Sequence, residues 1–241
     1  SLSSGVNTVT VGALPDMLTF TADGSKLLVA NEGTPTTYGS ASDPVGGVSI
    51  IDMATRSVTH VSLGGAIPTS GDGLRTNAGF NYEPEYIAVN STGTLAWVTL
   101  QEHNAIATLD LTSNQFTGIT GLGLKDYSLP QNAIDPSNNA PVALTTVNLK
   151  GAYQPDAIAT YEVGGQTFLV MANEGDARED DGDVARAGTL YGTAAPLDRI
   201  NVIKDLSSAS NLVSMGGRSF SIRDAAGNIV FDSGNILESE A

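Results

Sequence analysis

The sequence predicts an all-β protein, a partial β-propeller of about three to four blades, each a four-stranded antiparallel sheet with long loops. Three observations predict this class: the composition, a repeated double-strand segment, and the continuation of that segment by two further strands. Of 241 residues only 15% are charged and 6% aromatic, while 27 are glycine, and Val, Ile and Thr recur in short runs. That composition is typical of short strands joined by tight turns.

The first two strands of each blade come from three segments that align with one another. Each segment begins with a proline and an acid, then has an apolar strand, a Gly-containing turn, a second apolar strand, an amide and a glutamate. The segments are LPDMLTFTADGSKLLVANEG (14–33), EPEYIAVNSTGTLAWVTLQEHN (83–104) and QPDAIATYEVGGQTFLVMANEG (154–175). A segment repeated in this way predicts one structural unit per repeat.

Two of the repeats continue with a strand, an aspartate, a Thr- or Ser-rich turn and a further strand, at 46–63 and 104–122. Four successive antiparallel strands are the pattern of a propeller blade. The repeats are longer than the ~40–45 residues of a common blade. We assign the excess to Gly-, Pro-, Asn-, Ser- and Thr-rich loops at 33–46, 64–82 and 123–153.

The third repeat is followed by an irregular stretch. Residues 176–200 are polar, acidic and Gly/Ala-rich, which indicates a long loop with a short helix, and residues 219–241 have another hairpin pattern around the turn AAGN. Three or four blades do not close a ring. Residues 1–241 are therefore expected to be a single propeller domain, the N-terminal portion of a larger propeller, or part of an assembly.

The net charge of −15 excludes two partner classes. Such a surface repels nucleic acid and anionic lipid and favours cations. No apolar run approaches the ~20 residues that span a bilayer. The chain has no cysteine, which excludes disulfides, thiolate metal sites and cysteine nucleophiles.

Hairpin geometry brings pairs of acids to the open end of each repeated segment. In an antiparallel hairpin, cross-strand partners have a constant sum of residue numbers, and three acid pairs centre on the predicted turns. The pairs are Asp16 with Glu32, Glu85 with Glu102, and Asp156 with Glu174. The first strand of each propeller blade lines the central channel, so these acids should converge at one channel mouth.

Like charges directly opposite each other are destabilising, so the six acids require a compensating partner. One candidate is a hard cation such as Ca²⁺ or another divalent metal, with Asn31, Gln101 and Asn173 as further oxygen donors. A second candidate is a basic side chain, for which Arg178 is the nearest. A third is a proton shared between two acids, which raises one pKa.

Other polar groups have plainer interpretations. The acidic loop DAREDDGD (176–183) departs from the EF-hand pattern and is at least as well explained as a solvated loop. His103 follows Glu102, but a single loop histidine is seldom a ligand or an acid–base group. No nucleophile elbow, Walker loop, Rossmann fingerprint or zinc-protease motif is present, so no catalytic residue is assigned.

The ordered motifs LPDMLTF, LLVANEG, GGVSIID, EPEYIAV, YQPDAIATYEV and MANEGDARED resemble the bacterial choice-of-anchor I domain family, over about residues 5–240. That family is in turn similar to mesenchyme-specific cell-surface glycoproteins, and some members carry the label alkaline phosphatase-like. The resemblance implies a secreted or cell-surface β-propeller, extracellular or periplasmic in a bacterium, that continues beyond residue 241.

Two functions follow as hypotheses. The first is a calcium-binding surface module with a structural or interaction role, whose partners are divalent cations and the remainder of the propeller or another surface protein. The alternative is a metal-dependent phosphatase, in which the same acids hold the metal and Arg178 binds the phosphoryl group of the substrate.

Overall fold

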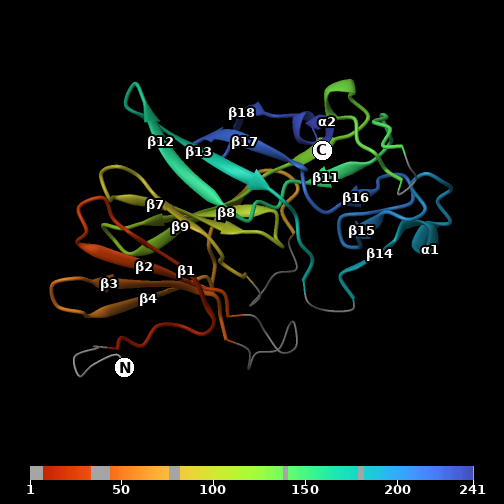
Figure 1. The fold of residues 1–241 in the computed structure, drawn as a ribbon. Coiled ribbons are helices and arrows are strands. Elements are labelled where there is room, and N and C mark those ends of the chain that lie inside the picture. Colours follow the sequence, from red (N-terminus) through yellow and green to blue (C-terminus); the bar gives the residue numbers. More distant parts are fainter. Residues whose placement is uncertain (1–7, 34–43, 76–81, 138–140, 179–181, 241) are drawn as a thin grey trace, which may run out of the picture.

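The computed structural model describes residues 8–33, 44–75, 82–137, 141–178 and 182–240, and these are folded mainly into β-strands (Figure 1). The predicted all-β, propeller-like class is confirmed. Three sheets, each built on four antiparallel strands, follow one another as the blades of a partial ring, and a fourth, mixed sheet lies beside them. No helix in these described parts is long and apolar enough to cross a membrane.

Blade 1 is the antiparallel sheet β1-β2-β3-β4. Its strands are β1 Pro15–Phe20, β2 Lys26–Asn31, β3 Gly47–Asp52 and β4 Val58–Ser62. The β1–β2 turn forms because the Asp23 carboxylate accepts hydrogen bonds from the Thr21 hydroxyl (2.6 Å) and the Ser25 N–H (3.0 Å). Gly24 supplies the positive φ of 69° that the turn needs.

Blade 2 repeats this arrangement and adds one short strand at its outer edge. It contains β6 Ile87–Val89, β7 Leu95–Leu100, β8 Ala105–Asp110 and β9 Gln115–Gly121, with β5 Thr69–Ser70 parallel to β9. Asp52 and Asp110 end the third strands of blades 1 and 2. Each accepts backbone N–H groups two and three residues further on, so the aspartate of the repeat is a turn residue.

Blade 3 is interrupted by an insertion between its second and third strands. It comprises β12 Ile158–Val163, β13 Gln166–Asn173, β17 Ser219–Asp224 and β18 Ile229–Asp232. The hairpin predicted in the tail is therefore the outer half of this blade. Its first strand, β17, pairs with β13 over its whole length, from Phe168 with Asp224 to Asn173 with Ser219.

The insertion supplies three strands of a mixed sheet, which we call the outer sheet, and the segment between blades 2 and 3 supplies the other two. Its strands in order are β10 Leu124–Asp126, β11 Lys150–Ala152, β16 Val213–Ser214, β15 Asn201–Ile203 and β14 Val184–Arg186. The helices are η1 Pro130–Asn132, α1 Ala187–Tyr191 and α2 Ile236–Glu240. The short helix expected within 176–200 is confirmed as α1.

The prediction that 123–153 is only a loop was wrong, because β10 and β11 belong to this sheet. These strands have three residues each, and β11 pairs in parallel with β16, which lies about sixty residues further along the chain. Strands this short carry no readable alternation of apolar and polar residues.

Apolar packing between neighbouring blades forms the main core. One cluster lies between blades 1 and 2 and includes Leu28, Ile50, Val98 and Leu109, all nearly fully buried. A second lies between blades 2 and 3 and is centred on Trp97, whose indole N–H donates to the Ala225 carbonyl at 3.0 Å. This stacking holds the first strands β1, β6 and β12 next to one another.

Trp97→Ala should remove about 3–5 kcal/mol from the free energy of unfolding, because it leaves a cavity between blades 2 and 3 and deletes a buried hydrogen bond. Urea titration followed by circular dichroism measures this value. Val142→Ala is the control, since Val142 is 71% exposed, and it should change stability by less than about 0.5 kcal/mol. Equal effects from the two substitutions would mean that blade packing does not support the fold.

Candidate functional site

The aligned first strands bring the predicted acids to one place. Asp16, Glu85 and Asp156 stand at or just before the starts of β1, β6 and β12, while Glu32 and Glu174 follow the ends of β2 and β13. Together they surround a cavity of about 290 Å³ that is lined by Asp16, Glu32, Glu85, Gln101, Asp156, Glu174 and Asp176. Six carboxylates and one amide therefore form its wall.

The sixth predicted acid, Glu102, lies behind this wall. Only 6% of its surface is exposed, and its Oε2 atom is buried without a hydrogen-bond partner among the described residues. Its carboxyl group is hydrogen-bonded to that of Glu85, which does line the cavity. All six predicted acids thus belong to one cluster, five of them at the cavity surface.

The predicted face-to-face register was wrong by one or two residues. The N–H of Glu32 donates to the Leu14 carbonyl, and the N–H of Glu85 donates to Thr99. In blade 3, Ile158 pairs with Met171, so the ladder extended to Asp156 meets Asn173 instead of Glu174. In blade 1 the cause is a bulge between Pro15 and Leu18, which a constant-sum rule ignores.

Backbone strain lies beside the acids in two of the three repeats. Leu14 and Gln154, each followed by proline and then aspartate, have positive φ values of 49° and 44°. Non-glycine residues seldom adopt this conformation, and such strain persists only where surrounding contacts hold it. It turns the chain sharply just before Asp16 and Asp156.

Gln154 is held by a complete set of hydrogen bonds. Its N–H donates to the Asn104 side chain at 3.0 Å, and its own side-chain amide donates to the Asp176 carbonyl at 2.6 Å. Its amide oxygen accepts the N–H of Gly216 at 3.3 Å. Gln154 is fully buried, so it fixes the blade 3 side of the cavity wall to blade 2.

The crowding of carboxylates changes their acidity. Burial, followed by the charge of Glu102 and a hydrogen bond to it, raises the pKa of Glu85 far above its usual range. Burial also raises the pKa of Glu102, and burial together with the charge of Asp156 raises that of Asp16. These raised pKa values favour a proton on the Glu85–Glu102 pair, which is the third compensation predicted from the sequence.

The amides have different roles from those expected. Gln101, with its nitrogen turned toward Glu85, donates to both carboxylate oxygens at 3.2 and 3.0 Å. Asn31 and Asn173 instead donate across their blades to the hydroxyl groups of Ser49 (2.9 Å) and Ser219 (3.1 Å). The expectation that these two asparagines supply oxygen to the cavity was therefore wrong; they brace the second strand against the third.

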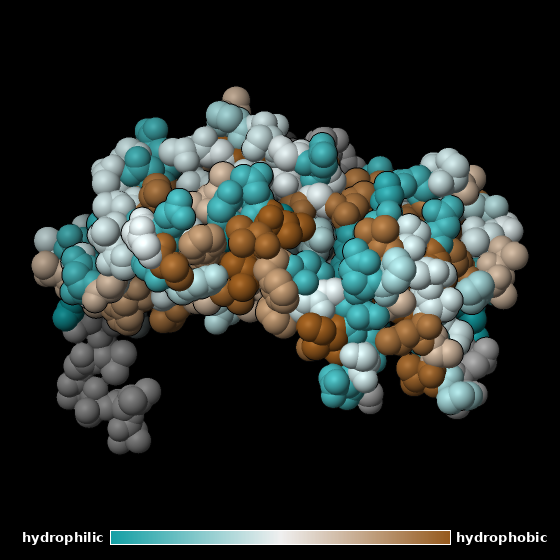
Figure 2. Space-filling view, turned by 90° about the horizontal axis from the view of Figure 1, so that it is seen from above, coloured by the Kyte–Doolittle hydropathy of each residue, from teal (hydrophilic) through white to brown (hydrophobic). Residues whose placement is uncertain are grey.

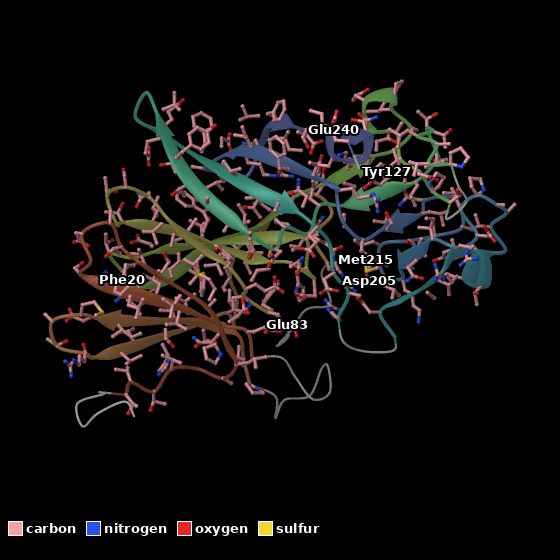
Figure 3. All side chains as sticks on the ribbon, in the orientation of Figure 1. Phe20, Glu83, Tyr127, Asp205, Met215 and Glu240 are labelled. Carbon is pink, nitrogen blue, oxygen red and sulfur yellow. The ribbon has the colours of Figure 1, made fainter. Side chains whose placement is uncertain are left out.

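A separate ionic network lies behind the Gln101–Asn104 turn. The buried guanidinium of Arg75 pairs with Asp183 and with Asp205 (3.0 Å), and it donates to the Glu102 carbonyl at 3.1 Å. Asp205 appears in Figure 3 at the junction between the blades and the outer sheet. This network ties the turn that carries Glu102 to the insertion.

Arg178 belongs to the same network. Its guanidinium lies 2.8 Å from His103 Nε2, and its backbone N–H donates to Asp183 at 2.9 Å. His103 is fully buried against the ring of Tyr82, and burial together with the charges of Arg178 and Arg75 holds its pKa well below the usual value. Arg178 is not among the residues that line the acidic cavity, so its role in substrate binding stays a prediction.

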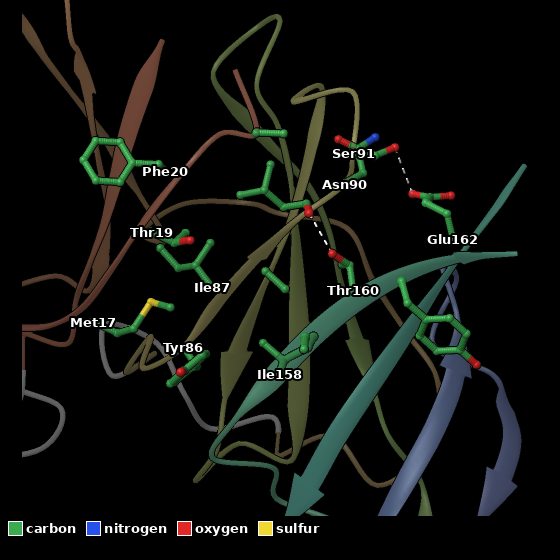
Figure 4. Close-up of a pocket in the computed structure, with 15 residues that line it drawn as sticks. Met17, Thr19, Phe20, Tyr86, Ile87, Asn90, Ser91, Ile158, Thr160 and Glu162 are labelled. Atoms are coloured by element: carbon green, nitrogen blue, oxygen red, sulfur yellow. Dashed lines mark hydrogen bonds between the residues drawn. The ribbon is translucent and has the colours of Figure 1, made fainter. Parts of the chain in front are cut away.

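Further along the inner strands, the wall of the channel becomes more apolar. A hollow of about 500 Å³ opens between β1, β6 and β12, lined by apolar groups such as Met17, Ile87 and Ile158 (Figure 4). The Thr160 hydroxyl donates to the Val89 carbonyl at 2.7 Å and binds two inner strands together. Acids are thus concentrated at one end of the channel wall.

The donor set of the cavity suits a hard cation. Carboxylate and amide oxygens are the ligands of Ca²⁺ and Mg²⁺, and the space leaves room for bound water. Within the described ranges, no three His, Cys, Asp or Glu side chains are already arranged to hold a metal ion. A bound cation would therefore draw the side chains inward or contact some of them through water.

One lining residue, Asp176, was not among the predicted ligands. The sequence assigns it to the solvated acidic loop 176–183, of which residues 179–181 lie outside the described ranges. Gln101, predicted as an oxygen donor, does line the cavity. The repeat offered a signal for Gln101, because it occupies the position of Asn31 and Asn173 but has a longer side chain.

The sequence matches the choice-of-anchor I domain family over residues 2–241, which confirms the resemblance to that family. The match does not extend to the animal cell-surface glycoproteins or to the label alkaline phosphatase-like. No curated protein matches the chain. Similar solved structures include hydrazine synthase of Kuenenia stuttgartiensis, with 16% identity and a TM-score of 0.34 over 96% of this chain and 52% of that chain. Another is the Cps50 (Swd1) β-propeller domain of Myceliophteria thermophila, with 11% identity and a TM-score of 0.37 over 95% and 58%. The chain spans little more than half the length of these two proteins.

Protonation of the Glu85–Glu102 pair predicts a falling stability with rising pH. A carboxyl whose pKa is raised by folding keeps its proton in the folded state after the unfolded chain has lost it. The free energy of unfolding in EDTA should therefore decrease above the ordinary glutamate pKa near 4.5, by about 1–3 kcal/mol up to about pH 7, where Glu102 titrates, and further toward pH 10, where Glu85 titrates.

Glu102→Gln should flatten this slope and make the protein more stable than the wild type at pH 8. Urea titrations at pH 5, 6, 7 and 8 measure the effect. The control is Asp110→Asn, because Asp110 is exposed and its turn hydrogen bonds lower its pKa out of this window. A wild-type stability that rises between pH 5 and 7 would contradict the pairing.

Proposed function

The chain belongs to the choice-of-anchor I domain family, and on that premise we propose that it is a calcium-binding β-propeller module of the cell surface or extracellular space, with a structural or interaction role. The observation that carries the proposal is the cavity whose wall has six carboxylates and one amide.

The arrangement of the cavity supports cation binding over simple solvation. Surface acids that only keep a protein soluble point apart into water, whereas here one acid of every blade is directed to the same cavity and a further carboxylate is buried behind it. Burial of unpaired charge is costly. A divalent cation would offset that cost and release the proton that Glu85 and Glu102 share.

Calcium suits the site better than the other common divalent ions. Zn²⁺ prefers nitrogen and sulfur ligands, and the lining contains neither. Mg²⁺ demands near-ideal octahedral geometry, whereas Ca²⁺ accepts six to eight oxygens in flexible arrangements. Acids contributed by three separate blades suit the flexible coordination of Ca²⁺. A Ca²⁺ ion bound by all three blades would then hold the blades together.

We do not extend the proposal to phosphomonoester hydrolysis. That activity would need a cation near the metal to hold the phosphoryl group, and the guanidinium of Arg178 lies against His103, outside the lining of the cavity. A phosphomonoester assay with Ca²⁺, Mg²⁺ and Zn²⁺ tests the alternative directly.

Isothermal titration with CaCl₂ should give a dissociation constant in the range of about 10⁻⁴–10⁻³ M, which is typical of extracellular calcium modules. A ligand that binds only the folded state stabilises it by about 2.7 kcal/mol at one hundred times its dissociation constant, so Ca²⁺ should raise the melting temperature. NaCl at equal ionic strength should not.

Asp156→Asn with Glu174→Gln should weaken calcium binding at least about tenfold, since two carboxylates that line the cavity lose their charge. The matched control is Asp52→Asn with Asp110→Asn, which changes the net charge equally at exposed turns outside the cavity. If the calcium affinity falls equally in both double variants, the loss is due to the net charge of the protein and not to the cavity. No heat of binding together with a melting temperature unaffected by EDTA would refute the proposal.

A further inference from the structure

Two segments that are far apart in the sequence meet at the acidic cavity. One is the turn 101–104 of blade 2, which carries Gln101 and Glu102 and which we call the blade 2 turn. The other is the loop that begins the insertion, which carries Glu174 and Asp176 and which we call the insertion loop. The position of one segment relative to the other decides whether their acids can face the same ion.

Arg75 holds the blade 2 turn by its backbone. The N–H of Arg75 donates to the His103 carbonyl at 3.2 Å, and its guanidinium donates to the Glu102 carbonyl at 3.1 Å. Close by, the Asn104 side chain donates to the Gly73 carbonyl at 3.0 Å. One arginine therefore fixes two consecutive carbonyl groups of the turn, directly behind the cavity wall.

The same guanidinium also holds the insertion. It forms a bidentate ion pair with Asp183 and a single ion pair with Asp205 at 3.0 Å. Asp183 in turn accepts the backbone N–H of Arg178, at the end of the insertion loop, at 2.9 Å. The guanidinium of Arg178 lies 2.8 Å from His103 Nε2, which is again in the blade 2 turn. The two segments are thus joined by two arginines.

This network lies in the interior of the molecule. Seen from above, the blades and the outer sheet meet in a continuous surface of mixed hydropathy (Figure 2), whereas the side chains of Arg75 and Asp183 are each only 2% exposed. The cost of removing two charges from water largely offsets their attraction, so a buried ion pair contributes little net stability. A bidentate arginine–carboxylate pair does fix geometry, because the planar guanidinium matches the carboxylate in one orientation.

We propose that Arg75 is a positioning residue for the calcium site, which holds the blade 2 turn against the insertion loop so that their acids face one ion. This inference rests on the proposed calcium-binding function. It adds a residue that contributes to the affinity without touching the ion. Replacement of residues that orient metal ligands from behind typically weakens metal binding by about 10–100-fold.

The linkage acts in both directions. If the contact between Arg75 and the insertion strengthens calcium binding, bound calcium must strengthen that contact by the same factor. The amides of β14 and β15, which lie next to Asp183 and Asp205 in the chain, should therefore exchange with solvent more slowly when calcium is bound.

Arg75→Lys tests the proposal, because lysine keeps the charge but cannot form the bidentate pair. Isothermal titration with CaCl₂ should give a dissociation constant raised at least about tenfold. The matched control is Arg223→Lys. Arg223 is equally buried, and its guanidinium donates to the Gly227 and Leu122 carbonyls at 2.7 and 2.8 Å, neither of which lines the cavity. The control should leave the calcium affinity unchanged.

A double-mutant cycle determines whether Arg75 acts through Asp183. Asp183→Asn should weaken calcium binding about as much as Arg75→Lys, and the double variant should bind no more weakly than either single variant, since both remove one contact. Asp205→Asn removes the same charge at a 29% exposed side chain with a single contact, so its effect should be smaller. Circular dichroism verifies the fold of each variant, and Asp205→Asn supplies the test if Asp183→Asn does not fold.

Hydrogen exchange followed by mass spectrometry gives a second readout, which a merely structural role of Arg75 would not change. At saturating calcium, wild-type β14 and β15 should be protected relative to the calcium-free protein. Arg75→Lys, also saturated with calcium, should lose this added protection.

Three results would overturn this inference alone, in a wild-type protein that binds calcium. The first is that Arg75→Lys binds calcium no more weakly than Arg223→Lys, and the second is that the effects of Arg75→Lys and Asp183→Asn simply add. The third is that calcium protects β14 and β15 equally in Arg75→Lys. A wild-type protein that binds no calcium would instead overturn the proposed function, and this inference with it.

Discussion

Apolar packing of one blade on the next is the interaction on which the rest of the molecule depends. Each blade is a small antiparallel sheet, and sheets of this size are stable only when their faces are covered. Blade 2 fulfils this requirement with Trp97 on one side and Val98 on the other, both nearly fully buried. The same packing forces β1, β6 and β12 to run side by side, and it thereby brings the acids at their starts into one cavity.

The alignment of the inner strands creates the acidic cavity, and repulsion between the carboxylates of the cavity destabilises the same alignment. Glu85 and Glu102 approach each other in a buried place, where their charges repel. The fold tolerates this because the surrounding backbone is firmly held: Gln154 joins blade 3 to blade 2, and Arg75 fastens the turn that carries Glu102 to the insertion. A site with crowded carboxylates on a rigid backbone can bind a cation without a change in the fold.

Calcium at the channel mouth would draw together acids from three blades. The insertion stays outside this geometry. The outer sheet packs beside the blades (Figure 1), and its connections to the cavity wall include Arg75, the Gln154–Gly216 hydrogen bond and the loop that carries Asp176.

The sequence by itself determined the all-β class, the hairpins of the three repeats and the placement of acids at their open ends, because alternation of side chains and turns such as that at Asp23 and Gly24 are local. It also determined that these acids would meet, through the general geometry of propellers. Only the tertiary structure decided the register, as the bulge in β1 illustrates. It likewise decided that Gln101 and Asp176 line the cavity while Glu102 lies behind it. The outer sheet was also beyond local inference, because its very short strands are paired by contacts between distant parts of the chain.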